Sequence, residues 1–207
     1  MNKDDGKVKR IWRCALLFPV LLSLLTACGK SESSESFDTL FFSDDTTAAA
    51  ELVADANEDL NKIKIMYKKN EDQLEDLKTA VGDKDIEKVK KITDDLVFII
   101  NDGITLGESA LGKIEKAEAM NVNSDFKDYL NLKAQSLQKQ LDAFEHRRQA
   151  ARLLRDSFGT NNPAAIEKAK GAFKEQEENA QKTLVVAQEY SKKANDLAKE
   201  ASKRPAN

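Results

Sequence analysis

The chain is poor in the residues on which catalytic, metal-binding and disulfide-bonded proteins depend. Its 207 residues include one histidine, two cysteines, three prolines and eight glycines. A single histidine cannot supply the Glu-x-x-His motif on two helices that carboxylate metal sites in helical bundles use. Neither the Gly-x-Ser-x-Gly elbow of hydrolases nor a glycine-rich phosphate-binding loop occurs in the sequence. We therefore expect a protein that is not an enzyme and that uses no metal or cofactor.

Both cysteines lie near the N-terminus, in a segment with the layout of a secretory signal. A basic head ending at Arg13 precedes an apolar run that starts near Cys14 and closes with Leu25-Thr-Ala-Cys28. This ending resembles the lipobox of bacterial lipoproteins. The resemblance covers residues 1–28 and implies cleavage after Ala27 and a diacylglyceryl thioether on Cys28. The mature chain would then have no thiol and would be held in a lipid bilayer by its acyl chains.

Two other interpretations of this segment are open. The apolar run is shorter than the roughly 20 residues that a membrane-spanning helix needs, and Lys30 follows it closely. An ordinary cleaved signal would leave Cys28 as a lone exposed thiol. With lipidation, the expected location is the cell envelope. Gly29 rather than Asp after the cysteine favours the outer membrane in an organism with two membranes; with one, the protein lies on the outer face of the cytoplasmic membrane.

Acidic residues outnumber basic residues in the rest of the chain. The first 27 residues contain five Lys/Arg and two Asp/Glu, so the remainder carries 28 basic and 34 acidic residues, a net charge of about −6. A nucleic-acid-binding protein usually has a basic balance, so we expect no such partner. Residues 28–45 read as a flexible, polar tether with three large apolar residues at helical spacing, Phe37, Leu40 and Phe41. They either cover the end of the folded domain, enter the lipid interface, or dock a partner.

From Thr46 onward, apolar residues recur alternately three and four positions apart, the spacing of helices that pack side by side. Cap and turn residues divide this pattern into four segments, 46–81, 84–120, 125–158 and 163–203. Short connections between long helices favour antiparallel neighbours. We therefore predict an all-α domain over 46–204, an elongated up-down-up-down four-helix bundle with heptad-like seams. A pair of long hairpins that completes its core only as a homodimer is the alternative.

Two glycines, Gly103 and Gly107, lie near the middle of the second predicted helix. Gly103 and Gly107 each cost about 1 kcal/mol relative to alanine in a helix, so they need a reason. Folding the chain back at its turns places Tyr67 opposite Ile99 and Phe144 near residue 101. The glycines therefore either make room for Tyr67 and Phe144, form a hinge, or line a ligand pocket.

Arginines on the third predicted helix form the remaining candidate site. Arg148, Arg152 and Arg155 share one helical face, next to the chain's only histidine, His146. Antiparallel folding brings this stretch, from Glu145 to Arg155, near Glu175, Glu177 and Glu178 of the fourth helix, which predicts salt bridges between the two helices. The alternative is a patch that binds an anion or a protein partner.

These features together favour a non-catalytic function. We predict a membrane-anchored envelope lipoprotein that binds or scaffolds another envelope protein through a helical rod. Two alternatives are an extracytoplasmic ligand-sensing bundle that acts with a membrane partner, and an immunity or inhibitor lipoprotein.

Overall fold

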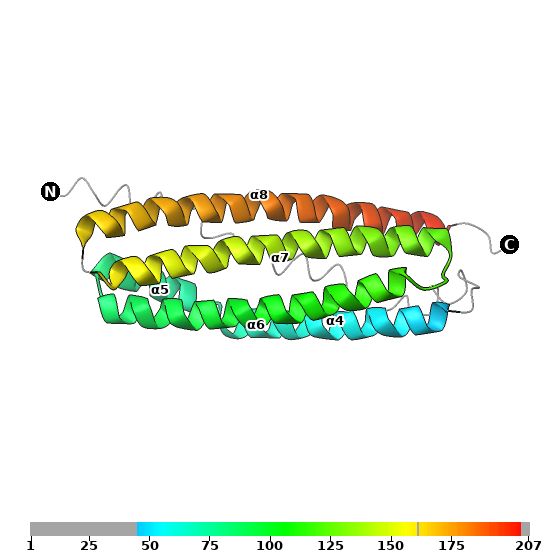
Figure 1. Cartoon of the computed structure of the whole chain (residues 1–207), viewed down its shortest axis with the longest axis horizontal. Coiled ribbons are helices and arrows are strands. Elements are labelled where there is room, and N and C mark those ends of the chain that lie inside the picture. Colours follow the sequence, from blue (N-terminus) through cyan, green and yellow to red (C-terminus); the bar gives the residue numbers. More distant parts are fainter. Residues whose placement is uncertain (1–44, 161, 204–207) are drawn as a thin grey trace.

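The computed structural model describes residues 45–160 and 162–203, and these residues fold into helices that pack together lengthwise into a rod (Figure 1). The predicted all-α class is confirmed. Five helices are present in the described residues, α4 (Thr46–Lys69), α5 (Gln73–Asp83), α6 (Ile86–Glu118), α7 (Ser124–Phe158) and α8 (Pro163–Ala201). Cys28, Phe37, Leu40 and Phe41 lie outside the described residues.

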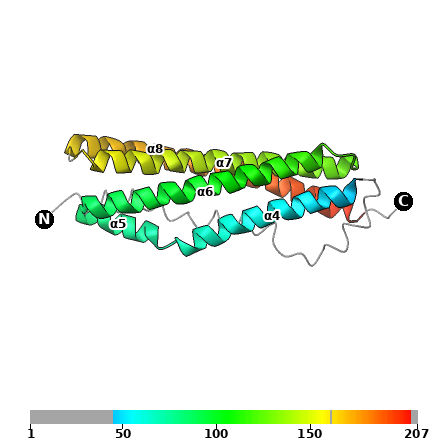
Figure 2. The ribbon, with the colours of Figure 1, turned by 60° about the horizontal axis from the view of Figure 1, so that its bottom comes forward.

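The prediction of one unbroken helix over 46–81 is wrong, because the chain bends at residues 70–72 and forms α4 and α5 instead (Figure 2). Asn70 ends α4, and its side-chain amide donates a hydrogen bond to the Met66 carbonyl oxygen at 2.7 Å. Asparagine side chains compete for helical backbone carbonyls in this way, which weakens the helix. Asn70 therefore stops a helix at a position that the apolar pattern alone would have continued.

Caps set the other helix boundaries. The side chains of Asp85, Asn123 and Asn162 accept hydrogen bonds from backbone N–H groups in the first turns of α6, α7 and α8. Pro163 occupies the first turn of α8, where its missing N–H costs nothing. Between α5 and α6, Lys84 adopts a left-handed conformation with φ of 58°. These caps place the starts of α7 and α8 within one residue of the predicted segment starts at 125 and 163.

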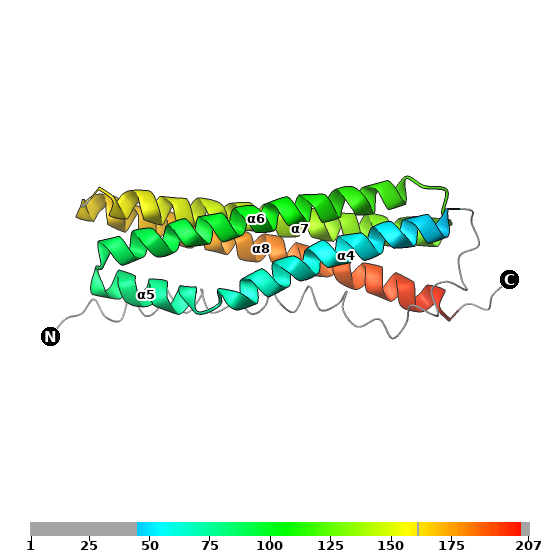
Figure 3. The same cartoon turned by 90° about the horizontal axis from the view of Figure 1, so that it is seen from below.

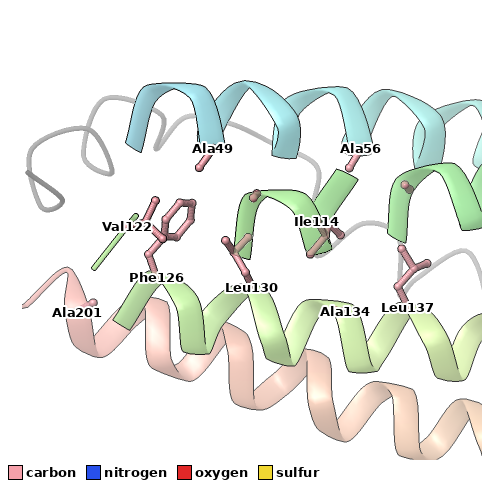
Figure 4. Packing of buried hydrophobic residues seen from close by; sticks show 11 residues of the cluster. Ala49, Ala56, Ile114, Val122, Phe126, Leu130, Ala134, Leu137 and Ala201 are labelled. Atoms are coloured by element: carbon pink, nitrogen blue, oxygen red, sulfur yellow. The ribbon is translucent and has the colours of Figure 1, made fainter. Parts of the chain in front are cut away.

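The core runs along the rod in three hydrophobic clusters, each drawing on three or more helices. At one end, α5 and the start of α6 meet the end of α7; in the middle, α4, α6, α7 and α8 meet around Tyr67 and Phe144. At the other end, Ala49 and Ala56 of α4 face Phe126 and Leu130 of α7 (Figure 4). The closely packed helix pairs are α7–α8, α6–α7, α4–α6 and α5–α6. Helix α4 therefore packs along α6 (Figure 3) but, by its backbone contacts, not closely along α8.

Candidate functional site

Arginines of α7 contact two neighbouring helices, α6 and α8. Arg148 donates a hydrogen bond to the Asn101 side-chain oxygen at 3.1 Å and pairs with Glu145, one turn earlier on its own helix. Arg155 lies 3.4 Å from Asp94 and 2.8 Å from Asp156. Asn101 and Asp94 both belong to α6, so Arg148 and Arg155 do not make the predicted salt bridges to α8, which Arg147 of the same stretch makes to Glu177. Arg148 and Arg155 lie on the α6–α7 side of the rod.

Arg152 and Phe98 are the exposed members of this surface. Arg152 forms no ion pair with any residue of the described part of the chain. Phe98 is 67% exposed on α6, four residues after Asp94 and three before Asn101. Because the two inter-helix contacts lie on either side of it, Phe98 shares their surface. We call Phe98, Arg148, Arg152 and Arg155 the α6–α7 face.

The ion pair from α7 to α8 is made instead by Arg147, a residue that sequence reasoning missed. Its side chain is 5% exposed, and its Nε lies 3.6 Å from Oε2 of Glu177, whose side chain is 19% exposed. Burial raises the pKa of the Glu177 carboxyl above its usual range, and the Arg147 charge offsets this only in part. Immediately beside this pair in the sequence, His146 Nδ1 lies 2.8 Å from the Gln176 side-chain oxygen. A polar belt therefore joins α7 to α8 near mid-height.

A sequence signal for Arg147 existed. The buried seam of α7 includes Phe144 and Ala151, which are seven residues apart. A seam that steps by three and then four passes through 147, so the interruption of the apolar pattern there marked a charged residue at a core position. That residue, Arg147, forms the ion pair between α7 and α8.

A second polar cluster links α4 to α6. The buried carboxylate of Asp59 lies 2.6 Å from Lys113 Nζ and 2.9 Å from Lys62 Nζ, and it accepts a hydrogen bond from the Ser109 hydroxyl at 2.8 Å. The bonds from Lys113 and Lys62 hold the pKa of the Asp59 carboxyl well below its ordinary value. Both carboxylate oxygens of Asp59 are bonded to neighbouring side chains. We therefore interpret this cluster as a structural contact that holds α4 against α6.

The space at the mid-helix glycines is filled by packed side chains. A Cβ built on Gly103 would lie 3.4 Å from the Tyr67 hydroxyl, which confirms the predicted partner. A Cβ on Gly107 would lie 2.6 Å from Cδ2 of Leu141 rather than near Phe144, so that predicted partner is wrong. Helix α6 is continuous across both glycines. Close packing therefore explains Gly103 and Gly107, and neither a hinge nor a pocket is needed there.

A hollow of about 40 Å³ lies toward the end of the rod where α4 begins. Its lining residues come from α4, α6, α7 and α8. Its apolar lining comes from Val53, Leu60, Ile114, Leu130 and Leu137. Lys133 also lines it, with its Nζ 3.1 Å from the Asn195 side-chain oxygen and 5.5 Å from the ring centre of Tyr129. Small-molecule sites usually have about 300–1,000 Å³, so this hollow is too small for such a ligand.

The described residues contain no group of three or more His, Cys, Asp or Glu side chains placed to hold a metal ion. Within residues 45–160 and 162–203, no helix combines the length and the apolar character that crossing a bilayer requires. Comparison with known proteins found no matching family model, no similar curated protein and no similar solved structure.

Proposed function

We propose that this protein is a membrane-anchored envelope lipoprotein that binds or scaffolds another envelope protein through its helical rod. The observation that carries the proposal is the filled core at mid-height. A sensor of small ligands needs a cavity, whereas Tyr67 and Leu141 occupy the space beside Gly103 and Gly107. Binding through an outer surface of the rod is the function that such a core supports best.

The proposed architecture has four arms that run up, down, up and down along heptad-like seams. Helices α4 and α5 together form the first arm, because both pack along α6 on either side of the bend at residues 70–72. Acyl chains on Cys28 would hold the N-terminal end at the membrane, in the outer membrane of an organism with two membranes. Two or three such chains anchor stably, since each buried methylene contributes about 0.8 kcal/mol.

Anchoring is tested by Cys28→Ala. We expect this change to move the protein from the membrane fraction to the soluble fraction, because it removes the thiol at the end of the lipobox-like segment, to which the lipid would be attached. Cell fractionation followed by immunoblotting measures the shift, and Ser33→Ala in the same segment is the control. A Cys28→Ala protein that remains in the membrane fraction would contradict the proposal.

Binding is tested on the α6–α7 face. A photo-crosslinking phenylalanine analogue at Phe98 is expected to form an adduct with an envelope protein, since aromatic and arginine side chains dominate binding surfaces. Arg152→Glu should lower the adduct yield at least fivefold, the effect of about 1 kcal/mol of lost affinity.

The same analogue at Val185 on α8, which is 46% exposed, is the matched control and should give no adduct. Equal adducts at Phe98 and Val185, or an Arg152→Glu yield equal to that of the parent, would show that the α6–α7 face is not the binding surface.

A further inference from the structure

The α6–α7 face has a large aromatic side chain that stays mostly uncovered. Phe98 is 67% exposed, the highest fraction among the exposed large apolar side chains of the described residues. Arg152 on the same face forms no ion pair with any described residue. Aromatic and arginine side chains are enriched at the positions that contribute most to binding. The charges around Phe98 indicate which partner this face fits.

Two contacts establish which residues of α6 and α7 lie at the same height along the rod. Arg155 lies 3.4 Å from the carboxylate four residues before Phe98, and Arg148 donates a 3.1 Å hydrogen bond to the amide three residues after it. Seven residues therefore separate these contacts on each of the two helices. Phe98 lies between the contacts on α6 and Arg152 lies between them on α7, so the two side chains have about the same height.

The two helices carry opposite charge over this length. Residues 94–102 of α6 include three aspartates and no basic residue, whereas residues 148–155 of α7 include three arginines and no acidic residue. Asp95 and Asp102 lie three residues before and four residues after Phe98, so they share its side of α6. Both are exposed and, like Arg152, form no ion pair within the part of the chain that the structure describes. The face therefore has an acidic half and a basic half at matched heights, each with a charge left unpaired.

We propose that the α6–α7 face binds the same face of a second copy of this chain, in a parallel dimer whose two-fold axis runs along the rod. Such an axis turns α6 of each chain onto α7 of the other and leaves every height unchanged. The acidic stretch 94–102 then lies on the basic stretch 148–155 of the second copy, and the contact occurs twice. Phe98 lies against the Arg152 guanidinium of the second copy, an arrangement that favours a cation–π contact. The inference rests on the proposed function, because it names the partner of the same face.

Charge also selects the orientation of the two chains. A two-fold axis across the rod at Phe98 would place α6 on α6 and α7 on α7. Residues 94–102 would then face the same acidic stretch of the second copy, and residues 148–155 would face the same basic stretch, and like charges at an interface repel. The parallel dimer avoids both repulsions. It also places the start of α4 at the same end in both chains, as anchoring of both in one membrane requires.

Disulfide formation between two differently tagged full-length copies in the same cells tests the proposal. One copy carries Thr105→Cys on α6, and the other carries Glu145→Cys on α7, each about one turn beyond the contact of Arg148 with α6. In the parallel dimer these two positions face each other. Parent chains, which contain only Cys14 and Cys28, give the background rate.

Glu178→Cys on α8 is the matched control for Glu145→Cys. Glu178 is an exposed glutamate at a similar height, because the neighbouring residue Glu177 pairs with Arg147. The mixed disulfide from Thr105→Cys is expected to form at least about tenfold faster with Glu145→Cys than with Glu178→Cys, since only the dimer contact raises the local concentration of the two thiols. Phe98→Ser in both copies should lower the faster rate at least about fivefold, because it removes an anchor of the contact.

Each other result contradicts the proposal. Equal rates for the Glu145→Cys and Glu178→Cys copies would overturn it, as would a rate that Phe98→Ser leaves unchanged while circular dichroism shows intact helices. The photo-crosslinked adduct at Phe98 separates the dimer from the proposed function. An adduct of two copies supports both, an adduct with a different envelope protein overturns the dimer alone, and the absence of any adduct contradicts both.

Discussion

Replacing Glu177 by leucine is expected to lower the free energy of unfolding by about 3–5 kcal/mol, because it leaves the buried Arg147 charge without its carboxylate. For a domain of this size the melting temperature should fall by roughly 6–20 °C. Thermal unfolding followed by circular dichroism measures the change.

The double variant Arg147→Met with Glu177→Leu is the decisive control. Replacing a buried ion pair by apolar residues of similar volume is often neutral or stabilising, so the double variant should recover most of the loss. Glu167→Ala removes the partner of Lys170 in an exposed pair, with Glu167 73% exposed, and should change stability by less than about 1 kcal/mol. A Glu177→Leu effect no larger than that of Glu167→Ala would show that the Arg147–Glu177 pair is not buried in the folded protein.

Gly107→Ala is expected to destabilise the protein by about 1–3 kcal/mol, although alanine is normally the better helix former. The added Cβ would lie 2.6 Å from Cδ2 of Leu141 and 3.9 Å from Cδ1 of Ile63, and both side chains are buried. The Leu141 side chain would have to shift within the packed middle cluster. Urea unfolding at constant m-value measures the loss.

Gly112→Ala on the same helix is the matched control. A Cβ on Gly112 would meet no atom within 4 Å, so the substitution should stabilise the protein by about 1 kcal/mol through helix propensity alone. The two glycine substitutions are therefore expected to have opposite signs. If both stabilise the protein, Gly107 and Leu141 are not in close contact.

Local features of the sequence predicted most helix boundaries. The side chains of Asn123 and Asn162 cap α7 and α8 within one residue of the predicted segment starts, because a cap bond joins groups only two or three residues apart. The seam of α7 also follows its apolar pattern, with Leu130, Leu141 and Phe158 all buried. Periodicity indicates which side of a helix is buried whatever covers it.

The candidate site was predicted less well because its contacts depend on register between helices. Sequence folding placed Phe144 beside Gly107, whereas a Cβ at Gly107 would meet Leu141, about one helical turn earlier on α7. The rotation of α7 about its axis is equally hard to predict, because neighbouring residues on a helix point about 100° apart. For this reason the sequence did not identify Arg147 as the residue that pairs with α8. Arg147 therefore faces α8 while Arg148 contacts α6.

The sequence by itself determined that the domain is all-α, which faces of its helices are buried, and where α7 and α8 begin to within one residue. These properties follow from propensities, caps and periodicity, all of which act over a few residues. Only the tertiary structure decided the Arg147–Glu177 pair, the contact of Gly107 with Leu141 and the hollow beside α4. Each depends on how far one helix is shifted or rotated against another, which no single helix encodes.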